Sequence, residues 1–303
     1  MGVRILDLDG SVRSQEAFVA RHRPAVLPAQ EWGPRIRMAC SFGRFRKFEE
    51  ALAQLADAHA NGERTITFCG SGDFHHVSLA LLGAVKTPVS LVVLDNHPDW
   101  MRGVPFMHCG TWLYHAARLP QVERIYHIGG DVDFDNYYQS MAPWHLLRTE
   151  KIIVIPGVRR FERRSWRAVR NEPLRLPGQT ALTFERIEQL LDLYRADLAS
   201  RPVYISLDKD VMTVQEGVVN WDSGHLALDE VFLVLSAVLR CAGEKLAAMD
   251  VLGDWSPVVL RGWLRHFMHW TEHPALAVDP ADAAERNARV NLAIVDQIDR
   301  LAA

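Results

Sequence analysis

Three potential metal ligands directly follow an apolar run in the first half of the chain. In "LVVLDNHPDW" (residues 91–100) they are Asp95, His97 and Asp99, each separated from the next by one residue. Side chains two positions apart in an extended chain point to the same side, so these three can converge on one point. Carboxylate and imidazole groups together suit Mn²⁺, Fe²⁺ or Zn²⁺. The alternative interpretation is a polar loop in which Asp and Pro simply end a strand.

A second apolar run ends in the same way. "VYISLDKDVM" (residues 203–212) places Asp208 and Asp210 two positions apart, directly after a strand candidate. Carboxylates gathered in one place repel one another unless cations neutralise them. Two ions satisfy such a set more readily than one, and ions that share ligands lie roughly 3.5–4 Å apart. Asp95 and Asp208 are placed to bridge two such ions.

A third segment contributes imidazole groups. "ITFCGSGDFHHVSLALL" (residues 66–82) contains a strand candidate, a Gly-rich turn, and His75 and His76 at the start of a helix. Ligand sites in open α/β sheets lie beyond the carboxyl ends of the strands. The three segments together therefore predict metal ligands at one edge of a sheet.

Such a site requires strands that end at a common edge. The strand candidates are short apolar runs, several of them rich in Val and Ile as in parallel strands covered on both faces: residues 64–69, 88–95, 124–129, 151–157, 202–208 and 245–251. Helix candidates alternate with them at residues 47–60, 76–84, 183–199, 228–242 and 284–301. The alternation predicts an α/β fold with a mostly parallel sheet, formed by a single domain over residues 1–303.

The composition is that of a globular protein without an affinity for polyanions or lipid. Of the 303 residues, 49% are hydrophobic and 23% charged, and the formal net charge of -3 gives no general attraction to nucleic acid or to membrane surfaces. The basic stretch at residues 159–170 is interpreted as a solvated helix or loop. No run reaches the roughly 18 apolar residues of a membrane span. Four scattered cysteines without a CxxC pair indicate reduced thiols in a cytoplasmic protein: Cys40, Cys69, Cys109 and Cys241.

On these motifs the chain resembles the arginase/agmatinase/formiminoglutamase superfamily, the ureohydrolases, whose relatives include the histone deacetylases. The family's Asp-x-His-x-Asp and Ser-x-Asp-x-Asp motifs are matched, in the family's order, by Asp95, His97 and Asp99 and by Ser206, Asp208 and Asp210. The family's Gly-Gly-Asp-His turn is similar to "GSGDFHH", although extra residues alter it. The resemblance covers residues 65–255 and implies a three-layer α/β/α sandwich of the arginase/deacetylase type.

The resemblance also implies two divalent metal ions, with Mn²⁺ as the first expectation and Zn²⁺ or Fe²⁺ as alternatives. Asp95 and Asp208 would bridge the two ions. The remaining ligands would be His97 and Asp210 on one ion, and Asp99 with His75 or His76 on the other. Aligning the chain on the helix that follows puts His75 at the ligand position, whereas aligning it on Gly-Asp puts Phe74 there, which cannot be a ligand.

A histidine outside the metal motifs is a candidate acid or base. "MHCGTW" (residues 107–112) resembles the family's His-Gly-Thr stretch, whose His shuttles protons in arginases. The resemblance implies that His108 gives or takes a proton at the leaving nitrogen, as an imidazole that titrates near neutral pH can do. The alternative is a histidine that only packs in the core or lies at the surface.

The substrate side of the family pattern is not kept. Met-Thr-Val at residues 212–214 replaces the family's usual Asp-Pro, and His225 replaces the second Gly of a Gly-Gly-Leu element. The family's Glu that holds a guanidinium is replaced by Gly253, with Asp254 one position later. His225 and Asp254 are therefore the candidate substrate-binding residues. We expect a retained metal core beside a changed pocket, and a substrate other than plain L-arginine.

These features predict a hydrolase that cleaves a C–N bond in a guanidino, amidino or amide small molecule, with a metal-bridging hydroxide as nucleophile. A second hypothesis is a deacetylase-like amidohydrolase with a single zinc held by Asp95, His97 and Asp208. A third is a non-catalytic metal-binding relative, which the loss of the Glu and of the Asp-Pro favours. The expected partner is the small-molecule substrate, not nucleic acid or a membrane, and the sequence leaves a homo-oligomer open.

Overall fold

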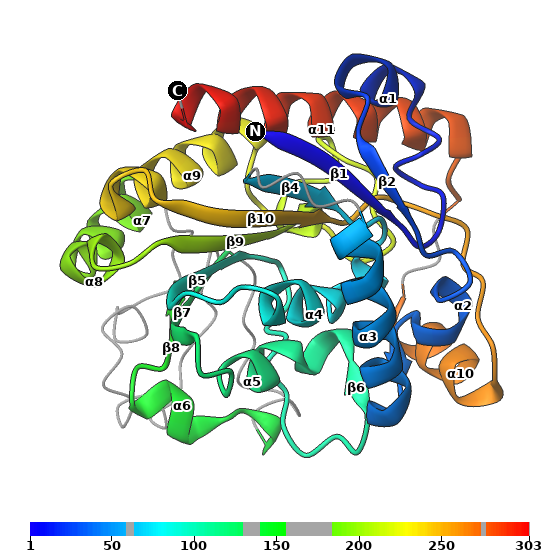
Figure 1. Cartoon of the computed structure of the whole chain (residues 1–303), viewed down its shortest axis with the longest axis horizontal. Helices are drawn as coiled ribbons and strands as arrows, with labels where there is room; N and C mark the ends of the chain where they lie inside the picture. Colours follow the sequence, from blue (N-terminus) through cyan, green and yellow to red (C-terminus); the bar gives the residue numbers. More distant parts are fainter. Residues whose placement is uncertain (59–63, 130–139, 156–183, 274–276, 303) are drawn as a thin grey trace.

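An eight-stranded sheet forms the centre of the protein (Figure 1). The computed structural model describes residues 1–58, 64–129, 140–155, 184–273 and 277–302. The strands lie in the order β2-β1-β4-β10-β9-β5-β7-β8, and each described pairing is parallel. Their bounds are β1 Gly2–Asp7, β2 Ala25–Pro28, β4 Thr65–Phe68, β5 Val89–Leu94, β7 Val122–Ile128, β8 Ile152–Ile155, β9 Val203–Asp208 and β10 Leu246–Leu252. A separate antiparallel pair is formed by β3 Ala39–Cys40 and β6 Met107–His108.

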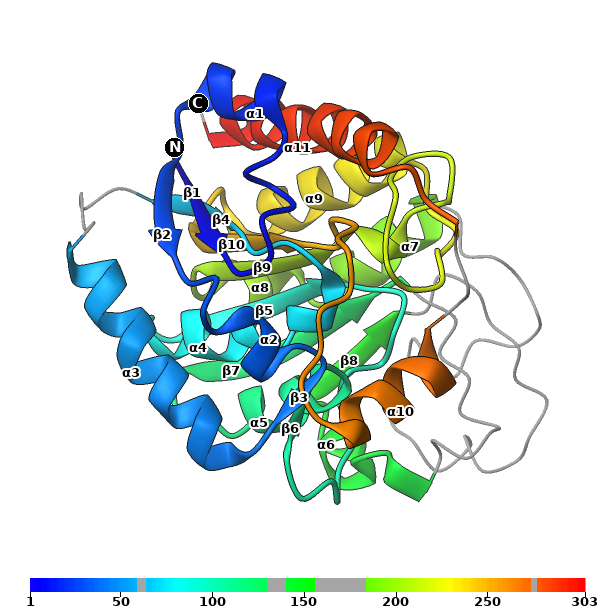
Figure 2. The ribbon, with the colours of Figure 1, turned by 90° about the vertical axis from the view of Figure 1, so that its right-hand side faces the viewer.

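Helices cover both faces of the sheet, as Figures 1 and 2 show. Against one face lie α1 Glu16–His22, α7 Phe184–Asp192, α8 Arg195–Ala199, α9 Leu228–Ala242 and α11 Pro280–Ala302. Against the other lie α3 Phe42–Ala58, α4 Val77–Gly83, α5 Trp112–Ala116 and α6 Trp144–Arg148. The short helix α2 Gly33–Ile36 and the helix α10 Trp263–Glu272 lie beside the loops at one edge. Each face has its own hydrophobic core, so the predicted three-layer α/β/α sandwich with a parallel sheet is confirmed.

The central strands carry the polar residues of interest to one edge. Every residue of β5 and β9 is buried, because helices pack on both faces of these strands. The register pairs Leu94 with Leu207 and Leu252 with Asp208, so β5, β9 and β10 end level with one another. The residues that follow these strands therefore meet at the same place.

The structure differs from the sequence prediction mainly at the N-terminal side. Strands β1 and β2 join the sheet, although neither is among the strand candidates of the sequence. The apolar pattern of β1 is interrupted by the charged residues Arg4 and Asp7, and β2 is only four residues long. Helix α3 begins at Phe42, five residues earlier than the predicted range, and the predicted helix 183–199 is divided into α7 and α8. The basic stretch 159–170 lies outside the described residues.

Two other predictions concern the cysteines and membrane-spanning helices. All four cysteines are buried and free, in agreement with the prediction that they form no disulfide framework. Among the helices of the described residues, none has the length and apolar character needed to cross a membrane.

Candidate metal centre

A cavity of about 510 Å³ opens at the edge where β5, β9 and β10 end. Its walls come mainly from the loops after β4, β5 and β9, and from one side of α10. Six of the predicted metal ligands line it: His75, Asp95, His97, Asp99, Asp208 and Asp210. The motif residues, which are spread over more than 130 positions, are thus brought together in one place.

His75 faces three of the carboxylates. Its Nδ1 atom lies 2.9 Å from Asp99 Oδ2, 3.2 Å from Asp95 Oδ2 and 3.5 Å from Asp208 Oδ2. All four side chains are buried. Asp95 and Asp208 both lie within 3.5 Å of one nitrogen, which is the close approach that a shared ion requires.

The other nitrogen of His75 fixes the state of the ring. Its Nε2 lies 3.1 Å from Ser206 Oγ, and Ser206 Oγ donates a hydrogen bond of 2.7 Å to Asp250 Oδ1. Because the Ser206 hydroxyl proton is given to Asp250, its oxygen accepts the proton on His75 Nε2. When the ring is neutral, this arrangement leaves the lone pair of Nδ1 directed at the three carboxylates; when it is protonated, Nδ1–H donates to them. This arrangement, a histidine held through its far nitrogen by a chain that ends in a carboxylate, is typical of metal ligands.

The donor set fits a cation. A lone pair beside three carboxylates is repulsive unless positive charge lies between them. One of those oxygens, Asp95 Oδ2, is buried and has no hydrogen-bond partner among the described residues. Burial lowers the pKa of His75, but Asp95 and Asp99 outweigh it and raise this pKa well above its usual value. The cluster therefore favours positive charge, whether from a proton or from a metal ion.

A second group of donors adjoins the first. His97 Nδ1 lies 2.8 Å from Asp210 Oδ2 and 3.8 Å from Asp95 Oδ1. Burial lowers the pKa of His97, but Asp210 and Asp95 outweigh it and raise this pKa to about 10. Two sets of ligand atoms could each hold an ion, namely His75, Asp95, Asp99 and Asp95, His97, Asp210. Asp95 belongs to both sets.

The aspartates carry more negative charge than a buried site tolerates alone. Burial and the neighbouring Asp210 raise the pKa of Asp208 well above its usual value. Burial and Asp95 likewise raise the pKa of Asp210. Divalent ions would relieve this repulsion, since they favour the ionised form of each carboxylate.

A second layer of side chains supports the cluster, and the sequence analysis did not identify it. Asp73 Oδ2 lies 2.6 Å from Arg37 Nε, and Asp73 Oδ1 accepts a 3.0 Å hydrogen bond from Trp221 Nε1. The Trp221 ring in turn packs against His97, with 5.2 Å between the ring centroids. Burial raises the pKa of Asp73, but Arg37 and His273 outweigh it and lower this pKa below its usual value. The only local signal for this network was the position of Asp73 in the Gly-rich turn.

His108 lines the same cavity without joining the ligand set. It is buried where β6 ends, and its Nδ1 accepts a 2.9 Å hydrogen bond from the backbone N–H of Gly110. Neutral His108 therefore carries its proton on Nε2. That atom lies 3.4 Å from Oε2 of Glu272, at the last residue of α10. Glu272 has no motif around it, and the sequence analysis missed it.

Two predicted site residues lie elsewhere. His76 is buried against Phe45, with 5.8 Å between the ring centroids, and does not line the cavity. Burial, with His108 and His75 nearby, lowers the pKa of His76 to about 3, so it is a neutral core residue. His225, a predicted substrate-binding residue, is exposed and also outside the cavity. Its neighbour Gly224 packs against the loop after β9, and its backbone N–H donates a 2.6 Å hydrogen bond to Asp210 O.

Asp254, the other predicted substrate-binding residue, does not line this cavity either. Its Oδ1 lies 2.7 Å from Lys209 Nζ, and both side chains are fully buried. Asp254 Oδ1 also accepts hydrogen bonds from Gln15 and Asn291. Lys209, between the two aspartates of the second motif, points to Asp254 and does not line the cavity. The charge of Asp254 is therefore neutralised within the protein.

Gly253 occupies a position that admits no side chain. Its φ is +88°, and a Cβ atom there would lie 2.5 Å from Asp208 Oδ1 and 2.7 Å from the backbone nitrogen of Lys209. A Glu at this position would displace the Asp208 carboxylate. The backbone of this loop therefore leaves no space for the family's Glu at this position.

The buried pair allows a stability prediction. Asp254→Asn should lower the free energy of unfolding by about 3–5 kcal/mol, because it leaves the Lys209 ammonium buried without a counter-charge. Urea denaturation measures the loss. The double variant Lys209→Met/Asp254→Asn should recover part of it, since the two residues act as one unit. Glu285→Gln, which removes an exposed carboxylate beside Arg289, is the control and should change stability by less than about 1 kcal/mol. An unchanged Asp254→Asn variant would mean that the pair does not stabilise the fold.

Comparisons with known proteins agree with this geometry. The Arginase family model matches residues 36–253. The chain is 27% identical over 197 residues to an uncharacterized protein of Thermotoga maritima, a match that covers 64% of this chain and 59% of that protein. Its fold is similar to that of the arginase of Helicobacter pylori, with a TM-score of 0.57 and 13% identity over 100% of this chain and 99% of the other.

The fold is similar also to that of proclavaminate amidino hydrolase from Streptomyces clavuligerus. The TM-score is 0.55 and the identity 17%, over 100% of this chain and 92% of the other. Identities this low show a shared fold and nothing more specific. The family match, by contrast, extends over more than half of the sequence and contains both aspartate motifs. The chain belongs to the arginase family.

Proposed function

We propose that this chain is a metal-dependent hydrolase that cleaves a C–N bond, other than a peptide bond, in a small molecule. The observation that carries the proposal is His75, whose Nδ1 atom lies 2.9–3.5 Å from carboxylate oxygens of Asp95, Asp99 and Asp208. Family membership, and a fold shared with an arginase and an amidino hydrolase, support the same class of reaction.

Two divalent ions account for the ligand set better than one. His75 and Asp99 would hold one ion, His97 and Asp210 the other, and Asp95 and Asp208 would be shared between them. The mixture of carboxylates and imidazoles makes Mn²⁺ the first candidate, with Zn²⁺ and Fe²⁺ next. Such ions, when bound, lower the pKa of a water molecule toward neutrality and offset negative charge that develops at the attacked carbon.

His108 would transfer a proton to the leaving group, and Glu272 would assist it. His108 lines the cavity, and as the protonated ring it would give a proton to a leaving nitrogen and return to the neutral form. Glu272, 3.4 Å from His108 Nε2, would orient the ring and stabilise its protonated form.

The cavity is poorly suited to a guanidinium that extends beyond the metals. Gly253 supplies no carboxylate, Asp254 is neutralised by Lys209, and Glu272 faces His108. Asp222 also lines the cavity, but it is exposed to solvent. Apolar side chains line much of the remaining wall: Met101, Val104, Phe106, Met141 and Met268. An unpaired cation buried there costs several kcal/mol. We therefore propose a guanidino, amidino or amide compound other than arginine or agmatine.

An activity panel tests the function. Mn²⁺-loaded protein is incubated with guanidines, amidines and N-acyl amines, and the release of urea, ammonia and free amine is measured. We expect hydrolysis of at least one class, abolished by a chelator, with near-background urea release from L-arginine and agmatine. Rapid urea release from either would contradict the substrate proposal. No hydrolysis by protein that retains both metals would favour a non-catalytic relative.

A further inference from the structure

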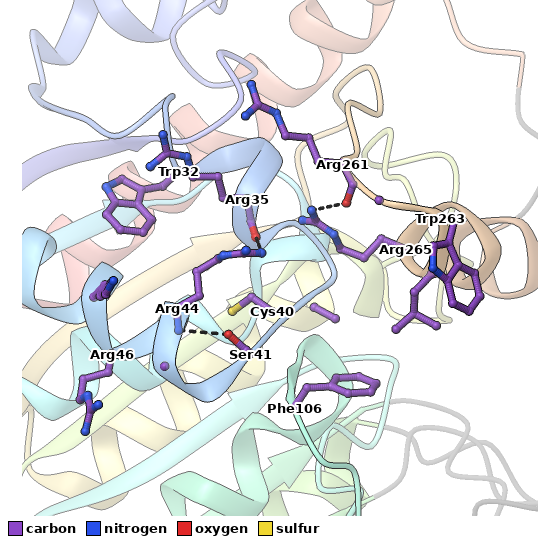
Figure 3. A pocket seen from close by; sticks show the side chains of 15 residues that line it. Trp32, Arg35, Cys40, Ser41, Arg44, Arg46, Phe106, Arg261, Trp263 and Arg265 are labelled. Carbon is purple, nitrogen blue, oxygen red and sulfur yellow. Dashed lines mark hydrogen bonds between the residues drawn. The ribbon is translucent and has the colours of Figure 1, made fainter.

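A second and larger pocket lies outside the metal cavity, between α2, the start of α3 and the start of α10 (Figure 3). Its volume is about 1080 Å³. Phe106 lines both this pocket and the metal cavity, so the two are neighbours that share one wall. None of the described residues that line it is acidic, whereas six are cations: Arg35, Arg44, Arg46, Lys47, Arg261 and Arg265.

One of these cations, Arg265, is buried although its side chain lines the pocket. The residue is only 8% exposed, and its guanidinium donates hydrogen bonds to the backbone oxygens of Pro34, at 2.8 Å, and Arg261. Within the described part of the chain it has no carboxylate partner. Buried arginines are normally paired with an anion, because an isolated buried charge is costly.

Arg44 adds a second unpaired cation at the same point. Figure 3 shows the side chains of Arg44, from α3, and Arg265, from α10, directed toward one another above Cys40 and Ser41. Arg44 Nη1 donates a hydrogen bond of 3.3 Å to Arg35 O and, like Arg265, has no ion pair in the part of the chain that the structure describes. Burial lowers the pKa of Arg265, and Arg44 and Arg261 lower it further by repulsion. An anion between the two guanidinium groups would remove that repulsion.

The backbone at this position favours negative charge as well. Ser41 and Gly43, at the N-terminal end of the 17-residue helix α3, line the pocket. The first turn of this helix contains no acidic residue. The N-terminus of a helix carries a partial positive charge and unpaired N–H groups, which bind anionic oxygens.

We propose that this pocket binds the phosphate or carboxylate group of a small organic anion. The volume exceeds what a single inorganic ion needs and is in the range of cavities that hold organic ligands. The rings of Trp32 and Phe106 provide apolar walls for the rest of such a molecule. The anionic group would lie between Arg44 and Arg265, and bidentate hydrogen bonds from guanidinium groups suit both phosphate and carboxylate.

Calorimetric titration of the full-length chain tests the proposal, with inorganic phosphate and citrate as separate probes. We expect saturable binding of at least one probe, and the tighter of the two identifies the preferred anionic group. Binding should persist after the metals are removed with a chelator, because the pocket contains none of the proposed metal ligands. Arg44→Gln should weaken it at least about tenfold, the effect of losing a hydrogen bond to a charged group.

Matched variants separate the pocket from general charge effects. Arg265→Gln should weaken binding as Arg44→Gln does, and because Arg44 is exposed, its variant still tests the site if Arg265→Gln fails to fold. Arg289→Gln, which removes an exposed cation on α11, should leave the affinity unchanged. Absence of saturable binding of both probes would overturn the proposal. So would binding that requires metal and is insensitive to Arg44→Gln, because the anion would then be in the metal cavity.

Discussion

Asp208→Ala should remove nearly all bound metal from the protein. After loading with Mn²⁺ and dialysis, we expect close to two ions per chain in the native protein and close to none in the variant, measured by elemental analysis. The reason is the position of Asp208, within 3.5 Å of His75 Nδ1 and hydrogen-bonded through Oδ1 to the backbone nitrogen of Asp210. A ligand shared by two ions cannot be lost without weakening both. Metal-dependent hydrolysis should fall to background with the metal.

Two further variants make the metal experiment specific. Asp192→Ala, which removes a half-exposed carboxylate at the end of α7, should bind as much metal as the native chain. Asp208→Asn keeps the shape of the side chain but removes its charge from a cluster of mutually repelling carboxylates. The metal-free form of this variant should therefore be at least as stable as metal-free native protein in urea denaturation. A clear loss of stability would show that Asp208 has a structural role that the repulsion argument does not include.

The number of ions distinguishes the remaining hypotheses. A stoichiometry of one that is unaffected by Asp210→Ala would favour the single-zinc, deacetylase-like alternative, in which Asp210 is not a ligand. A stoichiometry of two that falls to one in Asp210→Ala would assign the second ion to the His97 and Asp210 pair, which are 2.8 Å apart.

The ligand cluster could be predicted from sequence because its signals are local. Long buried strands such as β5 and β9 are continuous apolar runs, and their ends are marked by the first polar residue. Parallel strands end at one edge, so the residues that follow them lie along that edge. Asp95 and Asp208 lie close together because β5 and β9 are adjacent strands. The structure also places His75, and not His76, beside the carboxylates, in line with the alignment on the following helix.

The rest of the site depends on contacts that no local pattern shows. Asp254 is neutralised by Lys209, and the two residues are 45 positions apart and follow different strands. Glu272 reaches His108 from the end of α10, far along the chain, without any motif around it. The sequence likewise gives no sign that Arg44 and Arg265 meet in one pocket. Such partners follow from how helices pack over loops, which sequence periodicity does not determine.

His108→Ala should lower kcat by about 10²–10⁴, the usual effect of removing a general acid or base, while leaving metal content intact. The structure separates the two functions, because His108 lines the cavity but contacts Gly110 and Glu272 and none of the proposed ligands. The loss should appear in kcat and kcat/KM alike, since the proton transfer belongs to the transition state. Steady-state kinetics on the best substrate of the panel, with metal analysis of the same sample, measures both quantities.

Glu272→Gln provides the matched variant for His108. It keeps the size of the side chain and removes the carboxylate 3.4 Å from His108 Nε2, so the imidazole loses the charge that stabilises its protonated form. We expect a smaller fall in kcat than in His108→Ala. Removing Glu272 and His108 together should cost no more than removing His108 alone, because the carboxylate acts through the ring. Full activity in His108→Ala would assign the proton transfer to another group, and lost metal would make His108 a ligand.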